Sequence, residues 1–290
     1  MTSISFNLSG KIDPILVNVL RIVKKEADAL GFPFFVVGAT ARDILLEHCH
    51  AKRSPRRTSD LDIGIEVGGW DEFHKLSDAL IKIKFSPTDD PCKFRFDDIP
   101  LDVVPFGAIS DGDTIIRHPS DSALVMNVLG FQEAYDYSTM IRISDEPVLD
   151  IRVATIPGIA LLKLIAWDER YPDRSKDAVD LYFFMEKYAE AGNEDRLYGD
   201  DLDVMKSEGF DPEQAGIRIL GRDMGSMVSP EARDAIWVIL GKETGLQARY
   251  RLVEDIARSA LRLHDQATVL LPKLEKLKQG FEEGLSRNYP

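Results

Sequence analysis

The beginning of the chain alternates between helical and extended hydrophobic patterns. Apolar residues that recur at three- and four-residue spacing predict amphipathic helices, and short apolar runs bounded by polar residues predict strands. By these criteria we expect helices over residues 11–30, 41–47 and 70–83, and strands over residues 34–37 and 61–67.

The sequence between residues 94 and 153 indicates further strands. Apolar runs predict short strands at 94–96 and 101–104, and the acidic residues and proline of 97–100 predict the turn that joins them. Several more strands are expected between residues 114 and 153. The predicted fold class is therefore α/β of the α+β kind, with a mixed sheet in an N-terminal domain over residues 1–153.

From Pro157 onward the hydrophobic spacing is helical almost to the end of the sequence. Pro157 lies in the first turn of one expected helix, and the pair Ser229-Pro230 begins a later one. Residues 246–280 contain one or two long helices, whereas the acidic stretch 193–209 predicts a loop or a weak helix. We expect an all-helical C-terminal domain over residues 154–290.

The composition is that of an ordinary globular protein. Of the 290 residues, 44% are hydrophobic and 29% are charged. No apolar stretch approaches the roughly 18 residues that a membrane span requires. The first residues lack the basic and apolar segments of a signal peptide, and two cysteines do not make a disulfide framework. These features predict a cytoplasmic protein with no membrane partner.

The formal net charge of −13 argues against broad nonspecific binding to nucleic acid, whose phosphates favour basic surfaces. A local basic site remains compatible with this charge. Residues 52–57 carry four Lys or Arg side chains and lead directly into a pair of aspartates. Two interpretations of this run stay open, namely a solvated loop and a phosphate contact.

Asp60 and Asp62 are the most informative polar residues of the chain. Asp62 lies in the predicted strand 61–67, and Asp60 directly precedes it. Because side chains alternate along a strand, both project from the same face. Two adjacent like charges repel, and a divalent cation such as Mg²⁺, which one or two carboxylates hold together with substrate phosphates, would neutralise them. Metal binding is thus favoured over a plain exposed strand face. Asp102 is either a turn residue or a third ligand.

Small residues follow the predicted strand 34–37. The turn Gly38-Ala39-Thr40 would let backbone N–H groups approach a phosphate closely, and the Thr40 hydroxyl could add a donor. The alternative is a plain connection, because a single glycine in a strand–helix turn is common. The nearby aspartate pair favours the functional interpretation.

Lys163 is the only charged residue from Thr155 through Trp167. An ammonium group on an apolar helix face must reach water or meet an anion. Lys163 therefore either extends to the surface or contacts a triphosphate. In the next predicted helix Asp177 complements the helix dipole, whereas Asp180 is an unexpected acid beside two phenylalanines.

These segments resemble the DNA polymerase β-like nucleotidyltransferases. In that superfamily a strand, a Gly-Gly or Gly-Ser turn and a helix precede Asp-x-Asp on the next strand and a third acid on a later one. Within it the chain is similar to the AbiEii/AbiGii toxin family, the toxins of type IV toxin–antitoxin pairs and of phage abortive infection. The matching segments are 37–43, 59–62, 101–107, 161–167 and 176–181.

The resemblance implies roles for individual residues. It implies that Asp60, Asp62 and Asp102 bind Mg²⁺ (or Mn²⁺), and that these acids together with Lys163 are the catalytic residues. The residues that it implies at the nucleotide are Gly38, Ala39, Thr40, Arg42, Ser59, Lys163 and Asp180. Ala39 departs from the usual second Gly or Ser of the turn, and the Gly-x-x-x-Arg-Asp run is also similar to the tRNA CCA-adding enzymes.

The resemblance further implies a nucleotidyltransferase domain followed by a helical one, and an enzyme that transfers NMP from an NTP such as ATP. The expected acceptor is a hydroxyl of RNA, at the 3′ end of tRNA, and the expected protein partner is a cognate antitoxin. Two alternatives stay open. One is transfer to a small molecule or a protein, which the acidity of the chain favours, and the other is a non-catalytic, nucleotide-binding regulator.

Overall fold

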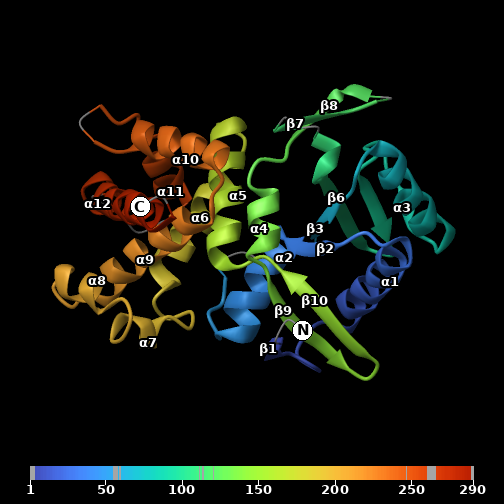
Figure 1. The fold of residues 1–290 in the computed structure, drawn as a ribbon, viewed down its shortest axis with the longest axis horizontal. Coiled ribbons are helices and arrows are strands. Elements are labelled where there is room, and N and C mark those ends of the chain that lie inside the picture. Colours follow the sequence, from blue (N-terminus) through green and yellow to red (C-terminus); the bar gives the residue numbers. More distant parts are fainter. Residues whose placement is uncertain are drawn as a thin grey trace. The chain divides into compact units, whose positions relative to one another are not determined.

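The computed structural model divides the chain into two compact units, Met1–Thr155 and Ile156–Pro290. The first contains strands and helices, and the second contains helices alone among its described residues (Figure 1). This arrangement confirms the predicted fold class. The residues that the structure describes are 4–54, 58, 60–110, 112, 114–119, 121–245, 247–259 and 266–288.

A mixed sheet organises the first unit. Its strands are β1 (Ile4–Asn7), β2 (Phe34–Val37), β3 (Leu61–Glu66), β4 (Ser86–Pro87), β5 (Lys93–Phe96), β6 (Ile99–Phe106), β9 (Thr139–Asp145) and β10 (Val148–Val153), in the order β1-β9-β10-β2-β3-β6-β5-β4. A separate pair consists of β7 (Ile115–His118) and β8 (Asp121–Asn127). The helical segments are α1 (Pro14–Leu30), α2 (Gly38–Asp43), the π-helix η1 (Ile44–Cys49), α3 (Trp70–Lys82), the 3₁₀-helix η2 (Ala108–Ser110) and α4 (Phe131–Asp136).

The central strands run in both directions. Strand β2 is antiparallel to β3, β3 is parallel to β6, and β6 is antiparallel to β5. Along β3 the side chains of Leu61, Ile63 and Ile65 are fully buried, whereas Asp62 is only partly buried. Because side chains alternate along a strand, the apolar side chains of β3 pack in the core and the Asp62 side chain projects from the opposite face.

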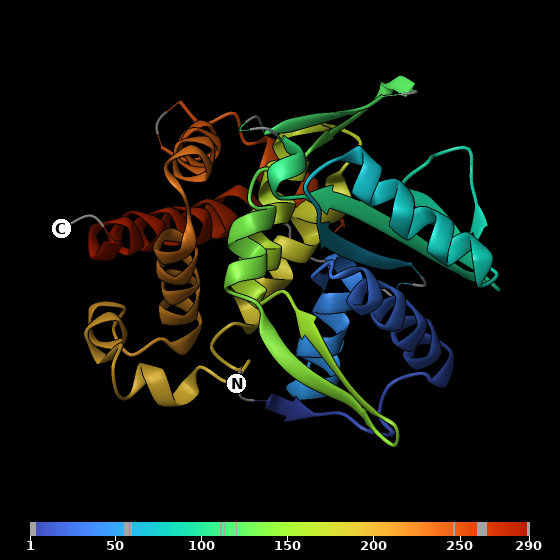
Figure 2. The ribbon, with the colours of Figure 1, turned by 45° about the vertical axis from the view of Figure 1, so that its right-hand side comes forward.

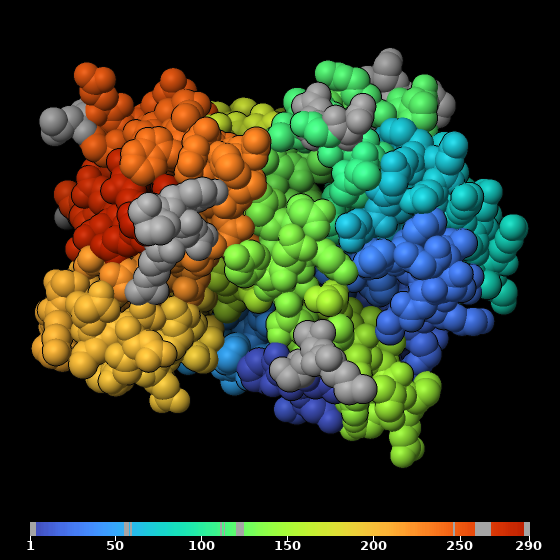
Figure 3. Space-filling view, in the orientation of Figure 1, coloured from blue at the N-terminus to red at the C-terminus, as the bar shows by residue number. Residues whose placement is uncertain are grey.

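Helix α1 shows how local signals set the ends of an element. The Asp13 side chain accepts a hydrogen bond of 2.7 Å from the backbone N–H of Ile15, and Pro14 follows this cap. Gly31 ends the helix in the left-handed conformation with φ 76°. The helix predicted over 11–30 is thus confirmed with a later start. It lies beside α3 over the sheet, and their blue and cyan surfaces adjoin (Figures 2 and 3).

Some predicted boundaries in the first unit are wrong. The helix predicted over 41–47 begins at Gly38, directly after β2, and continues through η1. The turn predicted over 97–100 is shorter, because Phe96 and Ile99 already pair across β5 and β6. Strand β1 and helix α4 were not predicted, since both are short and one lies at the edge of the sheet.

The second unit is built from helices of very different lengths. They are α5 (Ile156–Glu169), α6 (Ser175–Lys187), α7 (Glu194–Leu197), α8 (Leu202–Ser207), α9 (Pro212–Met227), α10 (Pro230–Glu243), α11 (Arg251–Ser259) and α12 (Gln266–Asn288). The predicted loop or weak helix over 193–209 contains the two short helices α7 and α8. Across the described parts of the chain, every helix is too short or too polar to cross a bilayer.

Helices α9 and α12 pack backbone against backbone (Figure 1). Gly221 and Gly225 of α9 face Gly280 and Gly284 of α12. A Cβ atom added to any of these glycines would overlap a main-chain carbonyl oxygen of the opposite helix. Only residues without a side chain permit so close an approach.

Charged side chains flank this crossing. The Nε groups of Arg218 and Arg222 on α9 donate to the Glu283 carboxylate on α12, over 2.9 and 2.6 Å. Burial raises the pKa of Glu283, but the hydrogen bonds from the two guanidinium groups prevail and hold this pKa below its usual value. Glu283 therefore stays ionised, and charge as well as shape joins the two helices.

We predict that Gly280→Ala destabilises the protein. The new methyl group would overlap the carbonyl oxygen of Arg218 and force the helices apart, which should lower the free energy of unfolding by about 2–3 kcal/mol. The matched control is Gly241→Ala in α10, where a Cβ meets nothing within 4 Å and the better helix former should stabilise by up to about 1 kcal/mol. Urea unfolding of both variants measures the difference, and equal effects would contradict the close crossing.

Candidate active site

Three charged side chains form one row across the neighbouring strands β3, β6 and β5. Asp62 on β3 is the register partner of Asp102 on the parallel strand β6. Asp102 is in turn the partner of Lys93 on the antiparallel strand β5. Register partners on neighbouring strands project from the same face of a sheet. The row therefore places two carboxylates and one ammonium side by side on that face.

The turn after β2 closes one end of this row. Val37 is the register partner of Asp62, and Gly38 follows it with φ 64°, a conformation that side chains rarely adopt. A Cβ on Gly38 would overlap the Oδ2 atom of Asp62. Glycine is thus required here both by the backbone and by the carboxylate against which it lies.

Thr40 fixes the segment that contains Asp60. Its buried hydroxyl donates a hydrogen bond of 2.7 Å to the backbone carbonyl oxygen of Asp60. The Asp60 side chain is exposed directly before β3. The structure thereby brings the small-residue turn and both aspartates together, where the C-terminal end of β2 lies beside the N-terminal end of β3. A contact of Thr40 with a triphosphate stays a prediction.

Asp102 lies inside β6, so its interpretation as a turn residue is wrong. Lys93 Nζ donates to Asp102 Oδ2 over 2.8 Å, with 48% of the lysine side chain and 29% of the aspartate side chain exposed. This hydrogen bond, opposed by burial and reinforced by the nearby carboxylates including Asp62, raises the pKa of Lys93. Lys93 was missed in the sequence, because a single lysine on a short strand gives no signal of its cross-strand partner.

Two other predicted nucleotide-binding residues lie on α2. Arg42 is fully buried, and its Nε and Nη2 atoms lie 2.8 and 2.7 Å from Asp43 Oδ1. Ala39 is partly buried in the first turn of the same helix. Direct contact of either residue with a nucleotide stays a prediction. Ser59 and residues 55–57 of the basic run lie outside the described residues.

The donor set at the row suits a divalent ion that keeps part of its shell for substrate. Within the described ranges, no group of three or more His, Cys, Asp or Glu side chains is arranged to hold a metal ion by itself. Mg²⁺ does not need such a group, since it is commonly bound through one or two carboxylates and substrate phosphates. The aligned carboxylates of Asp62 and Asp102, with Asp60 two residues before Asp62, fit this chemistry.

The second unit places its predicted residues in a buried ion cluster. Lys163 on α5 lies 2.8 Å from Asp177 Oδ1 and 2.7 Å from Asp180 Oδ2, both on α6, and only 8% of Lys163 is exposed. The alternative in which Lys163 extends to the surface is therefore wrong. Asp177 was ascribed to the helix dipole alone, although its three-residue spacing from Asp180 already put both carboxylates on one helix face. A phosphate contact of Lys163 stays a prediction.

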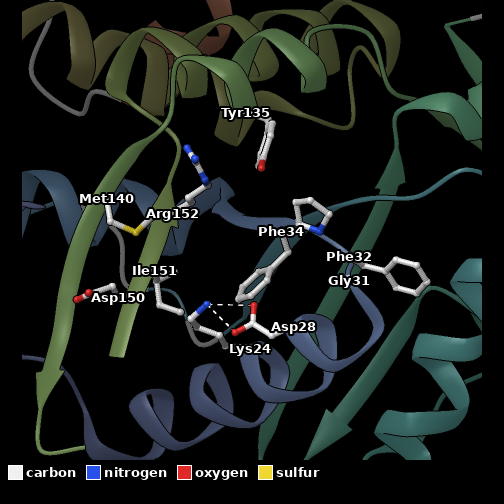
Figure 4. A pocket seen from close by; sticks show the side chains of 11 residues that line it. Lys24, Asp28, Gly31, Phe32, Phe34, Tyr135, Met140, Asp150, Ile151 and Arg152 are labelled. Atoms are coloured by element: carbon white, nitrogen blue, oxygen red, sulfur yellow. Dashed lines mark hydrogen bonds and ion pairs between the residues drawn. The ribbon is translucent and has the colours of Figure 1, made fainter. Parts of the chain in front are cut away.

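A cavity of about 380 Å³ lies at the opposite end of β2, beside Phe34 (Figure 4). Lys24 and Asp28 at its edge pair with each other over 2.9 Å, and the Arg152 guanidinium lies 5.2 Å from the centre of the Tyr135 ring. None of the predicted site residues lines this cavity. It is therefore separate from the row of charges.

Comparison with known proteins now defines the class. A family model described as the nucleotidyl transferase AbiEii toxin of type IV TA systems matches residues 23–220. The chain is accordingly a nucleotidyltransferase with a mixed α/β domain. It belongs to the AbiEii toxin family, a membership that implies an NTP substrate and an antitoxin partner. No curated protein matches the sequence.

Several solved nucleotidyltransferase structures are distantly similar. A putative nucleotidyltransferase from H. pylori shares 10% identity over 95% of this chain and 97% of its own, with a TM-score of 0.35. An antigenic nucleotidyltransferase-like protein from Paracoccidioides brasiliensis shares 15% identity over 69% of this chain and 92% of its own, with a TM-score of 0.39. The Thermotoga maritima CCA-adding enzyme complexed with tRNA shares 13% identity over 97% of this chain and 83% of its own, with a TM-score of 0.27.

We predict that Gly38→Ala abolishes binding of a Mg²⁺–nucleotide complex, because the methyl group displaces the Asp62 carboxylate. Gly31→Ala is the matched control, since Gly31 also has a positive φ but a Cβ there meets nothing within 4 Å. Both variants should lose about 1–2 kcal/mol of unfolding free energy through backbone strain. Calorimetric titration should find binding lost in Gly38→Ala alone. Intact binding in both variants would contradict the role given to this turn.

We also predict that Lys163→Met strongly destabilises the second unit. The substitution removes the lysine that lies against two buried carboxylates and leaves Asp177 only its 3.5 Å pair with Arg174, which should lower the free energy of unfolding by about 3–5 kcal/mol. Adding Asp177→Asn and Asp180→Asn should restore part of this loss. Lys187→Met removes an exposed pair with Glu190 and should cost at most about 1 kcal/mol. Denaturant unfolding ranks the variants, and similar losses for Lys163→Met and Lys187→Met would refute the cluster.

Proposed function

We propose that the first unit transfers a nucleoside monophosphate from an NTP to an acceptor hydroxyl, with Mg²⁺ (or Mn²⁺) held by Asp60, Asp62 and Asp102. The observation that carries this proposal is the register pairing of Asp62 with Asp102, against which Gly38 lies without a side chain. Carboxylates aligned in this way beside a small-residue turn suit a metal and a phosphate chain together. Family membership supports the same reaction.

In the proposed reaction the acceptor oxygen forms a bond with the α-phosphorus of the NTP. The bond from that phosphorus to the bridging oxygen breaks, pyrophosphate leaves with the electron pair, and the hydroxyl proton passes to solvent. A bound divalent ion would lower the pKa of the acceptor hydroxyl and neutralise charge on the leaving group. The chain's own residues position the carboxylates: Gly38 leaves room for the Asp62 side chain, and Thr40 holds the backbone of Asp60.

The acceptor that we favour is RNA, at the 3′ end of tRNA. The family description names a toxin, and modification of tRNA ends, which the sequence resemblance implies, would block translation and thus account for toxicity. A cognate antitoxin would then be the regulatory partner, and translation would place the reaction in the cytoplasm.

A small molecule or a protein is the second candidate acceptor. The formal net charge of −13 favours it, because an acidic surface repels the phosphates of RNA. The two candidates share the donor, the metal and the catalytic residues, so that they differ only in which molecule becomes labelled.

We predict that each labelled NTP, tested with Mg²⁺ and total tRNA, yields labelled RNA with the wild type for at least one nucleotide. The double variant Asp60→Asn, Asp62→Asn should lose roughly a hundredfold or more in rate, since both removed charges belong to the proposed metal ligands. The double variant Asp71→Asn, Asp78→Asn changes the charge equally on the exposed surface of α3 and should retain activity.

The outcomes separate the candidates. Label on RNA that depends on Asp60 and Asp62 supports transfer to tRNA. Label on a small molecule or on protein, with the same dependence, supports the second acceptor and removes the first. Equal activity of the Asp60→Asn, Asp62→Asn variant and the α3 variant would overturn the site itself.

A further inference from the structure

Lys93 completes the row of charges from the side opposite to Gly38. Its strand β5 is antiparallel to β6, which makes Lys93 the register partner of Asp102. The ammonium lies 2.8 Å from Asp102 Oδ2, within a row whose other acid is Asp62. The same carboxylate that is proposed as the third metal ligand is therefore already paired with a cation.

This ion pair is easily exchanged. The lysine side chain is 48% exposed and the aspartate side chain 29% exposed, so water screens their attraction and can replace either partner. The buried cluster of Lys163 contrasts with it, because there the two carboxylates are almost inaccessible. A divalent ion at Asp102 would also repel the ammonium, so the two cations compete for this carboxylate.

We propose that Lys93 is an exchangeable counter-ion of the active site, which neutralises Asp102 while no metal is bound and moves to the donor phosphates when the metal arrives. This inference rests on the proposed function. An ammonium on a flexible four-carbon stem can follow the negative charge from the carboxylate to a nearby phosphate. The NTP brings more negative charge than one divalent ion cancels, so a released cation gains a new partner in the same site.

The exchange makes two opposite predictions for Lys93→Gln. Without nucleotide, the variant should bind Mn²⁺ about two- to fivefold more tightly, because no internal cation competes for Asp102. With Mn²⁺ present, it should bind an NTP analogue roughly tenfold more weakly, because the phosphates lose a charged partner. A residue that merely supports the strand would not shift the two affinities in opposite directions.

The affinity for Mn²⁺ is measured from the electron paramagnetic resonance signal of the free ion, titrated against the protein alone. The affinity for the α,β-methylene analogues of the four NTPs is measured by calorimetric titration in excess Mn²⁺, because the analogues themselves chelate the ion. Lys93→Arg should keep the wild-type pattern, since it retains the charge. Lys24→Gln is the matched control, because Lys24 forms an exposed pair of 2.9 Å with Asp28 in the same unit and should change neither affinity. Circular dichroism shows whether each variant is folded.

The result that overturns the proposal is a Lys93→Gln variant with wild-type affinity for both Mn²⁺ and the analogue, or with both affinities shifted in the same direction. Failure of the proposed function is different. In that case the wild type binds Mn²⁺ no better than the Asp60→Asn, Asp62→Asn variant does, and both proposals fall together.

Discussion

The parallel pairing of β3 with β6 is the constraint on which the candidate site depends. It sets Asp62 opposite Asp102, and the buried side chains on the other face, such as Ile63 and Val103, lock that register. A slip by one residue would turn every side chain of β3 over, taking the carboxylate into the core and an isoleucine out of it. The apolar face of the sheet therefore determines the chemistry of its polar face.

The two units place a lysine among aspartates in two different ways. Around Lys163 the carboxylates are buried, and their cation cannot leave without a large loss of stability. The Lys93 and Asp102 side chains are partly exposed to water, and this ion pair can open at little cost in free energy. Burial, not the identity of the residues, thus distinguishes a structural ion cluster from one that is suited to ligand exchange.

The sequence indicated the acids and the positions of the central strands, but not which residues pair across the sheet. Asp60 and Asp62 were recognised because period-2 alternation and like-charge repulsion are local properties. Two other features depend on cross-strand register, which no local pattern contains. They are the close approach of Gly38 to the Asp62 carboxylate and the pairing of Lys93 with Asp102. Strand β1 was missed as well, because it is short, lies at the edge of the sheet and pairs with β9 more than a hundred residues later, Ile4 opposite Met140.

The glycine crossing of α9 and α12 has a consequence for biosynthesis. Residues 212–227 cannot bury their glycine face until residues 266–288 have left the ribosome, because that segment supplies the opposing backbone. The first unit, complete by Thr155, meets no such delay and can fold while translation continues. During synthesis a ribosome-bound chain therefore carries a finished sheet with its row of charges well before the helical unit has closed.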